Sequence, residues 1–165
     1  MWDLYNEHGI RELFGGRISE EEFLRTFIEK HGLPIALEEY MRIIRDAITP
    51  IEGTRGVIES LRAQGYKLGL LSDHGREWAA FCEEKFGHHR LYDAVVYSFD
   101  VGFCKPNAAM FARALALLNA EPEEALFIDD NPRNVAGAEA FGIRGILFTD
   151  APTLRKDLSS LGIDA

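Results

Sequence analysis

The sequence predicts an α/β fold, a parallel sheet covered by helices on both faces, with a small helical cap at the N-terminus. After Pro50, short apolar runs alternate with amphipathic stretches, several of which end at a glycine. Strands that alternate with helices pair in parallel, because right-handed crossovers return each strand to the same sheet. Before Pro50 only helical spacing is present. We therefore expect an α-helical cap subdomain at residues 1–50 and an α/β core at residues 51–165.

The first fifty residues contain the patterns of three helices. Ser19 followed by Glu22 forms a capping box, which predicts a helix that continues to Gly32. A second helix is predicted from the apolar stripe that runs from Leu37 to Ile48. A weaker helical pattern covers residues 3–14 and is closed by two glycines.

The core is predicted to begin with a helix at residues 57–61 and to continue as four strands with a helix after each of the first three. Each predicted strand is a short apolar run, as is typical of a buried parallel strand. Pro106 is expected in the first turn of its helix, where the missing N–H costs nothing. The predicted strands are residues 66–71, 94–97, 125–128 and 145–148, and the helices after the first three are residues 78–86, 106–118 and 135–141.

The composition limits the partners and the location of the protein. The chain has 165 residues, and 27 acidic against 18 basic side chains give a net charge of −9 and a pI near 5.0. Such a balance disfavours nucleic acid and anionic membrane surfaces, both of which attract basic faces. The chain shows no apolar run long enough to span a bilayer and no leader pattern. Two cysteines are too few for a disulfide framework. We expect a cytoplasmic protein.

Polar residues follow three of the predicted strands. Ser72 and Asp73 follow the first, Lys105 lies beyond the second, and Asp129 with Asp130 ends the third. Ligands of parallel sheets bind beyond the carboxyl ends of the strands, so these side chains are expected to converge. Carboxylates that leave several waters on the ion suit Mg²⁺, and a lysine supplies positive charge to a phosphate. The pattern predicts a phosphoryl site with Mg²⁺.

These strand ends resemble motifs two, three and four of the haloacid dehalogenase-like (HAD) hydrolases. The matching residues are Leu70-Leu71-Ser72-Asp73, Lys105-Pro106 and Phe127-Ile128-Asp129-Asp130-Asn131 with Asn134. Within the family, the chain is most similar to small-cap phosphatases of the glucose-1-phosphatase and epoxide hydrolase N-terminal type. The resemblance implies a Rossmann-like core and Mg²⁺-dependent hydrolysis of a small phosphorylated metabolite.

The resemblance also implies roles for individual residues. Ser72, Asp73 and Lys105 are expected to hold the phosphate, although the family often carries Asn where Asp73 stands. Asp129 and Asp130 are expected to bind Mg²⁺, and Asn134 to support them. The substrate itself is not implied, because cap residues select it.

One family motif is absent. The family's catalytic residues form an Asp-x-Asp motif on the central strand, and this sequence contains no Asp-x-Asp. The first aspartate of that motif attacks phosphorus and the second protonates the leaving group. By analogy, the missing strand would lie between the strands that end at Ser72 and Asp129. We therefore expect this chain to be inactive or nearly inactive.

Two explanations of the missing motif remain open at this stage. In the first, which we prefer, a strand with Asp-x-Asp lies upstream and has been cut off. In the second, the chain is a noncatalytic phosphate-binding or interaction module whose sheet closes by direct pairing of the Ser72 and Asp129 strands. Exposed strand edges in the gap would favour a homodimer. A haloacid dehalogenase is a further alternative, but the metal-binding carboxylate pair argues against it.

Structural interpretations of the same residues were weighed against these roles. The segment Asp129-Asp130-Asn131 is also typical of a helix cap, and Ser72 could cap the helix that follows it. His74 reads as a surface or capping histidine. Asp100 is an improbable replacement nucleophile. A zinc set of Cys82, His88, His89 and Cys104 lacks the spacing of structural zinc sites, so Cys82 is interpreted as a helix core residue.

Overall fold

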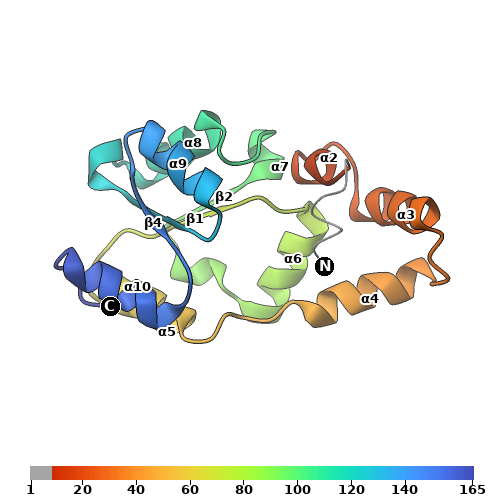
Figure 1. Cartoon of the computed structure of the whole chain (residues 1–165), viewed down its shortest axis with the longest axis horizontal. Coiled ribbons are helices and arrows are strands. Elements are labelled where there is room, and N and C mark those ends of the chain that lie inside the picture. Colours follow the sequence, from red (N-terminus) through yellow and green to blue (C-terminus); the bar gives the residue numbers. More distant parts are fainter. Residues whose placement is uncertain (1–8) are drawn as a thin grey trace. The chain divides into compact units, whose positions relative to one another are not determined.

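A computed structural model describes residues 9–165 (Figure 1). The chain folds into two compact units, and each unit is built from three separate segments of the sequence. Unit 1 comprises Met1–Thr49, Ser72–His88 and Tyr97–Cys104, and unit 2 comprises Pro50–Leu71, His89–Val96 and Lys105–Ala165. The chain leaves unit 1 at Thr49, next to the expected boundary, and returns to it for two later segments. The division into a cap at 1–50 and a core at 51–165 therefore stays a prediction.

Unit 1 is built from helices packed around one apolar cluster. Its helices are α2 (Ile10–Phe14), α3 (Glu20–His31), α4 (Leu37–Ala47), α6 (Arg76–Phe86) and α7 (Ser98–Val101). Phe23 of α3 and Phe14 of α2 both meet the Trp78 ring edge-on, at centroid distances of 6.4 and 6.1 Å. Glu20, 1% exposed, accepts a hydrogen bond from Trp78 Nε1 at 2.7 Å and pairs with Arg45 of α4. These contacts join α3, α4 and α6.

The capping box is confirmed. The Glu22 amide donates to Ser19 Oγ at 3.2 Å, and the Ser19 amide donates to Glu22 Oε2 at 2.8 Å. Gly32 ends α3 at a φ of +58°, a left-handed conformation that L side chains adopt rarely. The helical pattern of residues 3–14 is described only from residue 9 onward, and α2 is its described part.

Unit 2 contains the strands and the helices that cover them. Its elements are α5 (Thr54–Ala63), β1 (Gly69–Ser72), η1 (His89–Leu91), β2 (Ala94–Tyr97), α8 (Ala108–Leu118), η2 (Pro122–Glu124), β3 (Leu126–Asp129), α9 (Pro132–Ala140), β4 (Arg144–Leu147) and α10 (Ala151–Ser160). The last residues of β1 and β2 fall in unit 1. Figure 1 shows α5 and α10, which are far apart in sequence, side by side, and their apolar faces share one cluster. A second cluster joins α8, α9 and the other face of the strands.

The strands do not form one continuous sheet. β1 pairs with β2, and β3 pairs in parallel with β4 in the register Leu126↔Arg144 to Asp129↔Leu147. The α/β class, a Rossmann-like core with short parallel strands, is confirmed. β1 and β3 are not hydrogen-bonded to each other, so the direct closure of the sheet by these two strands is not found. Within residues 9–165, no strand joins the two pairs, and the sequence resemblance expects the central strand between them.

Several element boundaries differ from the sequence prediction. α8 begins at Ala108 and is capped by the Asn107 side chain, so Pro106 precedes the helix and is not in its first turn. The helices α7 and α10 were not predicted; α10 is capped by Asp150, whose side chain accepts from the Thr153 amide at 2.7 Å. Within residues 9–165, no helix combines the length and the apolar character that crossing a bilayer requires.

Candidate functional site

A buried ion pair joins two of the predicted site residues in unit 2. Lys105 Nζ lies 2.7 Å from Asp129 Oδ2, and the two side chains are 10% and 7% exposed. Lys105 Nζ also donates to the Leu71 carbonyl oxygen of β1 at 3.1 Å. The same ammonium lies 5.8 Å from the centre of the Phe127 ring. Lys105 therefore connects the carboxyl ends of β1 and β3 and is not an ordinary surface lysine.

The other oxygen of Asp129 is held by the residues that begin α9. Asp129 Oδ1 accepts from the Asn131 amide at 2.9 Å and from Asn134 Nδ2 at 3.0 Å. Asn134 is buried, and Asn131 caps the helix by accepting from the Arg133 amide at 3.0 Å. The capping role weighed for this segment therefore belongs to Asn131. The arrangement fixes the Asp129 carboxylate, and Asn134 supports it.

Asp130 has a different environment from its neighbour. Its side chain is exposed, and it makes no hydrogen bond or ion pair with residues 9–165. A carboxylate has about four lone-pair positions, of which Asp129 uses three. One position on Asp129 and the whole of Asp130 are thus available as hard oxygen donors. This donor set fits Mg²⁺, which takes one or two carboxylates and keeps several waters.

Close packing of α9 positions Lys105. A Cβ atom on Gly137 would lie 2.3 Å from Cβ of Pro106, the residue after Lys105. Only glycine leaves room for the proline ring at this point. Gly137 therefore allows α9 to lie against the segment that carries Lys105. The sequence showed Gly137 near the site, but only the packing shows why it is glycine.

The two other predicted phosphate-binding residues, Ser72 and Asp73, belong to unit 1. Ser72 ends β1, directly after the Leu71 that accepts from Lys105, and its hydroxyl has no hydrogen-bond partner in the described part of the chain. The cap of α6 is Gly75, so Ser72 does not cap that helix. The structure therefore joins Lys105, Asp129 and Asn134 by direct contacts within unit 2.

His74 and the two cysteines lie in partly apolar surroundings. Burial lowers the pKa of His74 to about 4, and the nearby charge of His88 acts in the same direction. Burial likewise raises the pKa of the Cys82 and Cys104 thiols. His74 is therefore a neutral packed histidine, and the interpretation as a surface or capping residue is wrong. Cys82 is 9% exposed, which confirms that it is a core residue of α6.

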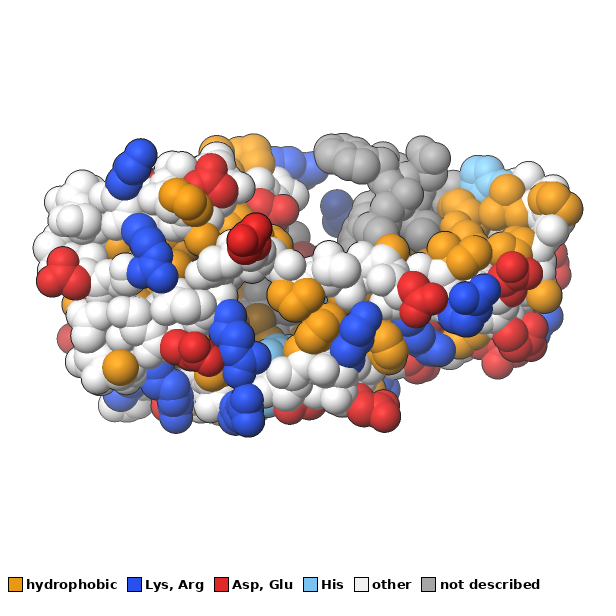
Figure 2. Space-filling view, turned by 90° about the horizontal axis from the view of Figure 1, so that it is seen from below, with side chains coloured by type: hydrophobic (Ala, Val, Ile, Leu, Met, Phe, Trp, Pro, Cys, Tyr) orange, Lys and Arg blue, Asp and Glu red, His pale blue; other side chains and the backbone are white. Residues whose placement is uncertain are grey.

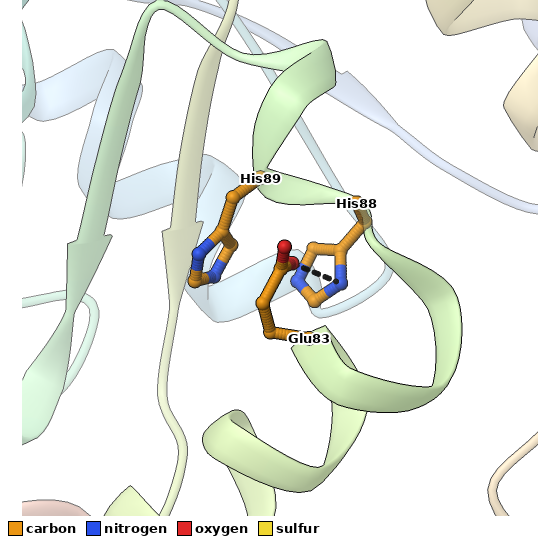
Figure 3. A group of neighbouring side chains, drawn as sticks. All are labelled: Glu83, His88 and His89. Carbon is orange, nitrogen blue, oxygen red and sulfur yellow. Dashed lines mark ion pairs between the residues drawn. The ribbon is translucent and has the colours of Figure 1, made fainter.

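A histidine–carboxylate pair lies at the end of α6 in unit 1, between Glu83 of the helix and His88 after it. Figure 3 shows the Glu83 carboxylate turned toward the His88 ring, and the two atoms His88 Nδ1 and Glu83 Oε2 lie 3.3 Å apart. His88 Nε2 lies 3.3 Å from the Tyr97 hydroxyl. His89, also drawn there, begins η1 in unit 2. Among residues 9–165, no group of three metal-binding side chains includes Cys82 or Cys104.

Unit 1 also contains a polar hollow of about 230 Å³ between α2, α3 and the start of α6. Its charged lining residues are Arg17, Glu22, Arg76 and Glu77. Glu77 Oε2 is buried and has no hydrogen-bond partner in the described structure. Arg76 is committed to other contacts, since it lies 4.4 Å above the Phe99 ring and 3.5 Å from Asp100.

Comparisons with known proteins agree with this geometry. The family model of haloacid dehalogenase-like hydrolases matches residues 3–148. The chain is 30% identical over 149 residues to a flavin mononucleotide hydrolase of Arabidopsis thaliana, covering 90% of this chain and 60% of that protein. It is 30% identical over 127 residues to a glyceraldehyde 3-phosphate phosphatase of Methanothermobacter thermautotrophicus, covering 74% and 55%. The chain thus spans less than two thirds of these relatives.

Solved structures show the same fold. A predicted HAD-like hydrolase from Porphyromonas gingivalis superposes with a TM-score of 0.78 at 26% identity, covering 99% of this chain and 83% of that one. A HAD family enzyme from Bacteroides thetaiotaomicron, solved with magnesium and inorganic phosphate, gives 0.75 at 19% identity, covering 91% and 79%. With the strand-end motifs and the Lys105–Asp129 pair in place, these matches establish that the chain belongs to the haloacid dehalogenase-like hydrolases.

Proposed function

We propose that this chain carries the phosphate- and Mg²⁺-binding part of a phosphate monoester hydrolase and that, as written, it does not turn substrate over. The observation that supports the first half is the buried Lys105–Asp129 pair with the unpartnered Asp130 beside it. A fixed ammonium next to available carboxylates at the carboxyl end of β3 suits a metal-bound phosphate. The substrate is a small phosphorylated metabolite whose identity the site residues do not specify.

Each residue has a defined task in this proposal. Lys105 binds a phosphoryl oxygen through its ammonium, and the Ser72 hydroxyl donates to a second one. Asp129 and Asp130 hold Mg²⁺, which when bound supplies positive charge to the phosphoryl oxygens. Asn131 and Asn134 orient Asp129 through its Oδ1. Asp73 carries a negative charge, which disfavours binding of an anionic phosphate, and is therefore assigned the weakest part in binding.

The absence of Asp-x-Asp from the chain supports the second half of the proposal. The family reaction passes through an aspartyl-phosphate that water then hydrolyses, and this chain has no aspartate at the position of the nucleophile. Loss of the nucleophile of a hydrolase costs on the order of 10⁶ in turnover. Phosphate monoesters are so inert that full catalysis supplies up to about 10²¹. Binding by Lys105 and Mg²⁺ alone does not replace that contribution.

A phosphatase assay tests the proposal directly. We expect the purified chain to hydrolyse p-nitrophenyl phosphate no faster than buffer with the same MgCl₂. Mg²⁺-dependent turnover that disappears in Asp130→Asn would contradict the proposed inactivity. Turnover that persists in Asp130→Asn would indicate a contaminating phosphatase, and repurification would remove it.

A gain-of-function experiment tests the assignment of the site. A chain extended ahead of Met1 by an apolar strand that ends in Asp-x-Asp, with a flexible linker, is expected to gain Mg²⁺-dependent activity. The matched control carries Asn-x-Asn in the same extension and stays inactive. An extended chain that folds, binds Mg²⁺ and phosphate, and still shows no turnover would contradict the proposed catalytic context.

A second candidate is a noncatalytic module that binds phosphate ligands. The missing motif is the observation that favours it. The two candidates can be distinguished by experiment. If the chain is a noncatalytic module, the extended chain would stay inactive although Mg²⁺ and phosphate both bind. A haloacid dehalogenase is disfavoured, since its displacement chemistry needs no metal and leaves Asp130 without a task.

A further inference from the structure

Two packing contacts fix how α9 is turned about its axis in unit 2. A Cβ atom on Gly145 of β4 would lie 2.6 Å from Val135 Cγ1, so the Val135 side of α9 lies over β4. A Cβ atom on Gly137 would lie 2.3 Å from Cβ of Pro106, so the Gly137 side lies against the segment that carries Lys105. Val135 and Gly137 are two positions apart, which places them about 160° apart around the helix. The helix therefore has one side toward β4 and the opposite side toward Lys105.

Arg133 lies on the side of α9 that faces Lys105. It precedes Gly137 by four residues, and residues four apart share one face of a helix. Helical side chains also lean toward the N-terminus of their helix. The N-terminus of α9 is the end at the site, where Asn134 donates to Asp129 at 3.0 Å. This position directs the Arg133 side chain toward the carboxyl end of β3, beside Lys105.

The guanidinium of Arg133 is unpaired in the described part of the chain. Within residues 9–165 it makes no hydrogen bond, ion pair or ring contact, and the residue is exposed. Its backbone amide, by contrast, donates to Asn131 Oδ1 at 3.0 Å, which holds the first turn of the helix in place. Asp130, three positions earlier, is likewise exposed and unpaired. Two opposite charges that lie this close in the chain and do not pair with each other are both available to ligands.

The charges of the proposed site leave an incoming anion incompletely neutralised. Lys105 and Asp129 lie 2.7 Å apart and cancel each other. The Asp130 carboxylate offsets one of the two charges that Mg²⁺ brings, so one positive charge remains for the ligand. A phosphate monoester carries about two negative charges at neutral pH, and any further anionic group raises that number. A second cation beside the metal therefore favours such a ligand, and Arg133 is in a position to supply it.

We propose that Arg133 binds a second anionic group of the substrate, and that the site prefers small phosphate monoesters that also carry a carboxylate or another phosphate. The planar guanidinium can donate two parallel hydrogen bonds to either group, which a lysine does not do. Lys105 and Mg²⁺ bind the phosphoryl group, and Arg133 binds the group at the other end of the ligand. The inference rests on the proposed function and adds the class of substrate to it.

A matched pair of ligands tests the assignment by isothermal titration in buffer with MgCl₂. Carboxyethyl phosphate and hydroxypropyl phosphate have the same number of carbon atoms and differ in the charge of the far end. We expect the unchanged chain to bind carboxyethyl phosphate more tightly by about tenfold or more. Arg133→Gln should remove this preference and leave the affinity for hydroxypropyl phosphate largely unchanged. Propanediol bisphosphate should show the same dependence on Arg133, and its affinity relative to carboxyethyl phosphate identifies the preferred anionic group.

The control variant is Arg113→Gln on α8. Arg113 is an exposed arginine of the same unit and has no partner in residues 9–165. This variant should keep the preference for carboxyethyl phosphate, and both variants should unfold at the same urea concentration as the unchanged chain. Equal affinity of the unchanged chain for the two ligands, a preference that survives Arg133→Gln, or one that is lost in Arg113→Gln as well would overturn the inference and leave the proposed function standing. Failure of both ligands to bind the unchanged chain would overturn the proposed function, and the inference with it.

Discussion

At the scale of single residues, the site depends on two adjacent aspartates in unlike surroundings. The Asp129 side chain is only 7% exposed, is paired with Lys105 and is held by two asparagines, whereas Asp130 is exposed and has no partner in the described residues. The Asp129 carboxylate is held in one position by its contacts, whereas the Asp130 carboxylate is free to adjust to an ion. Removal of Asp130 therefore changes ligand binding and leaves the Lys105–Asp129 pair intact.

We expect Asp130→Asn to weaken Mg²⁺ binding in the presence of inorganic phosphate by about tenfold or more. Isothermal titration of MgCl₂ into the phosphate-saturated chain measures this. The matched control is Asp157→Asn, which removes a half-buried carboxylate from α10 and should bind Mg²⁺ like the unchanged chain. Equal affinity of the Asp130→Asn and control variants would remove Asp130 from the metal site.

His74 is the residue whose titration is coupled to folding. Its pKa of about 4 in the folded chain lies below the ordinary 6.5, because burial disfavours the charged ring. Between these values the unfolded chain binds a proton that the folded chain does not, so stability falls as the pH decreases from 6.5 to about 4. The full loss is about 3 kcal/mol.

Urea unfolding followed by Trp78 fluorescence measures this loss across the same pH interval. The variant His74→Leu keeps the backbone hydrogen bond to Ser98 Oγ and removes the titrating ring. Its stability is expected to decline less over the interval, because the remaining titrating groups are common to both chains. Parallel pH profiles for the two chains would show that His74 is not coupled to folding.

At the scale of elements, short local signals decide where the helices begin and how closely they pack. The Ser19–Glu22 box starts α3, and Asn131 starts α9 beside the site. Glycine allows two segments to pack closely, as at Gly137, where α9 lies against Pro106. Helix α5 offers a contrast, since a Cβ on Gly56 would lie 3.4 Å from the flexible end of Arg155.

We expect Gly137→Ala to destabilise the chain by about 1–3 kcal/mol, because the added methyl group collides with the rigid proline ring. It should also weaken phosphate binding, because a displacement of Pro106 would also move the adjacent Lys105. The control Gly56→Ala should stabilise the chain by about 0.5–1 kcal/mol, because alanine favours the helix and meets only a movable side chain. Urea denaturation measures both, and a neutral Gly137→Ala would contradict the packing argument.

At the scale of the whole molecule, the charge distribution and the divided sheet are the main features. Acidic and basic side chains are interspersed, with apolar side chains between them, on the face shown in Figure 2. With a net charge of −9, the chain offers little attraction to a polyanion. We expect no binding of a labelled DNA duplex in low-salt buffer by anisotropy, with a basic DNA-binding protein as the positive control. Salt-sensitive binding would contradict this expectation.

Much of the site could be predicted from the order of motifs along the chain. Lys105, Asp129 and Asn134 were expected to act together, and direct contacts join them. The role of Asn131 as the cap of α9 and the dependence on Gly137 were not predicted, because they follow from distances between segments. α7 was missed because four residues with mixed polarity show no periodicity. The buried state of His74 was missed because nothing beside it in sequence indicates what packs over it.

The sequence by itself determined the alternation of strands and helices, the capped start of α3, and the residue types that follow each strand. These features depend on neighbours a few positions away, through hydrogen bonds to the backbone and through apolar spacing. Only the tertiary structure decided that β1 and β3 do not pair with each other in the described residues, and that Lys105 joins their ends. Strand pairing depends on backbone groups from distant segments that compete for partners, and no local pattern records which edges stay unpaired.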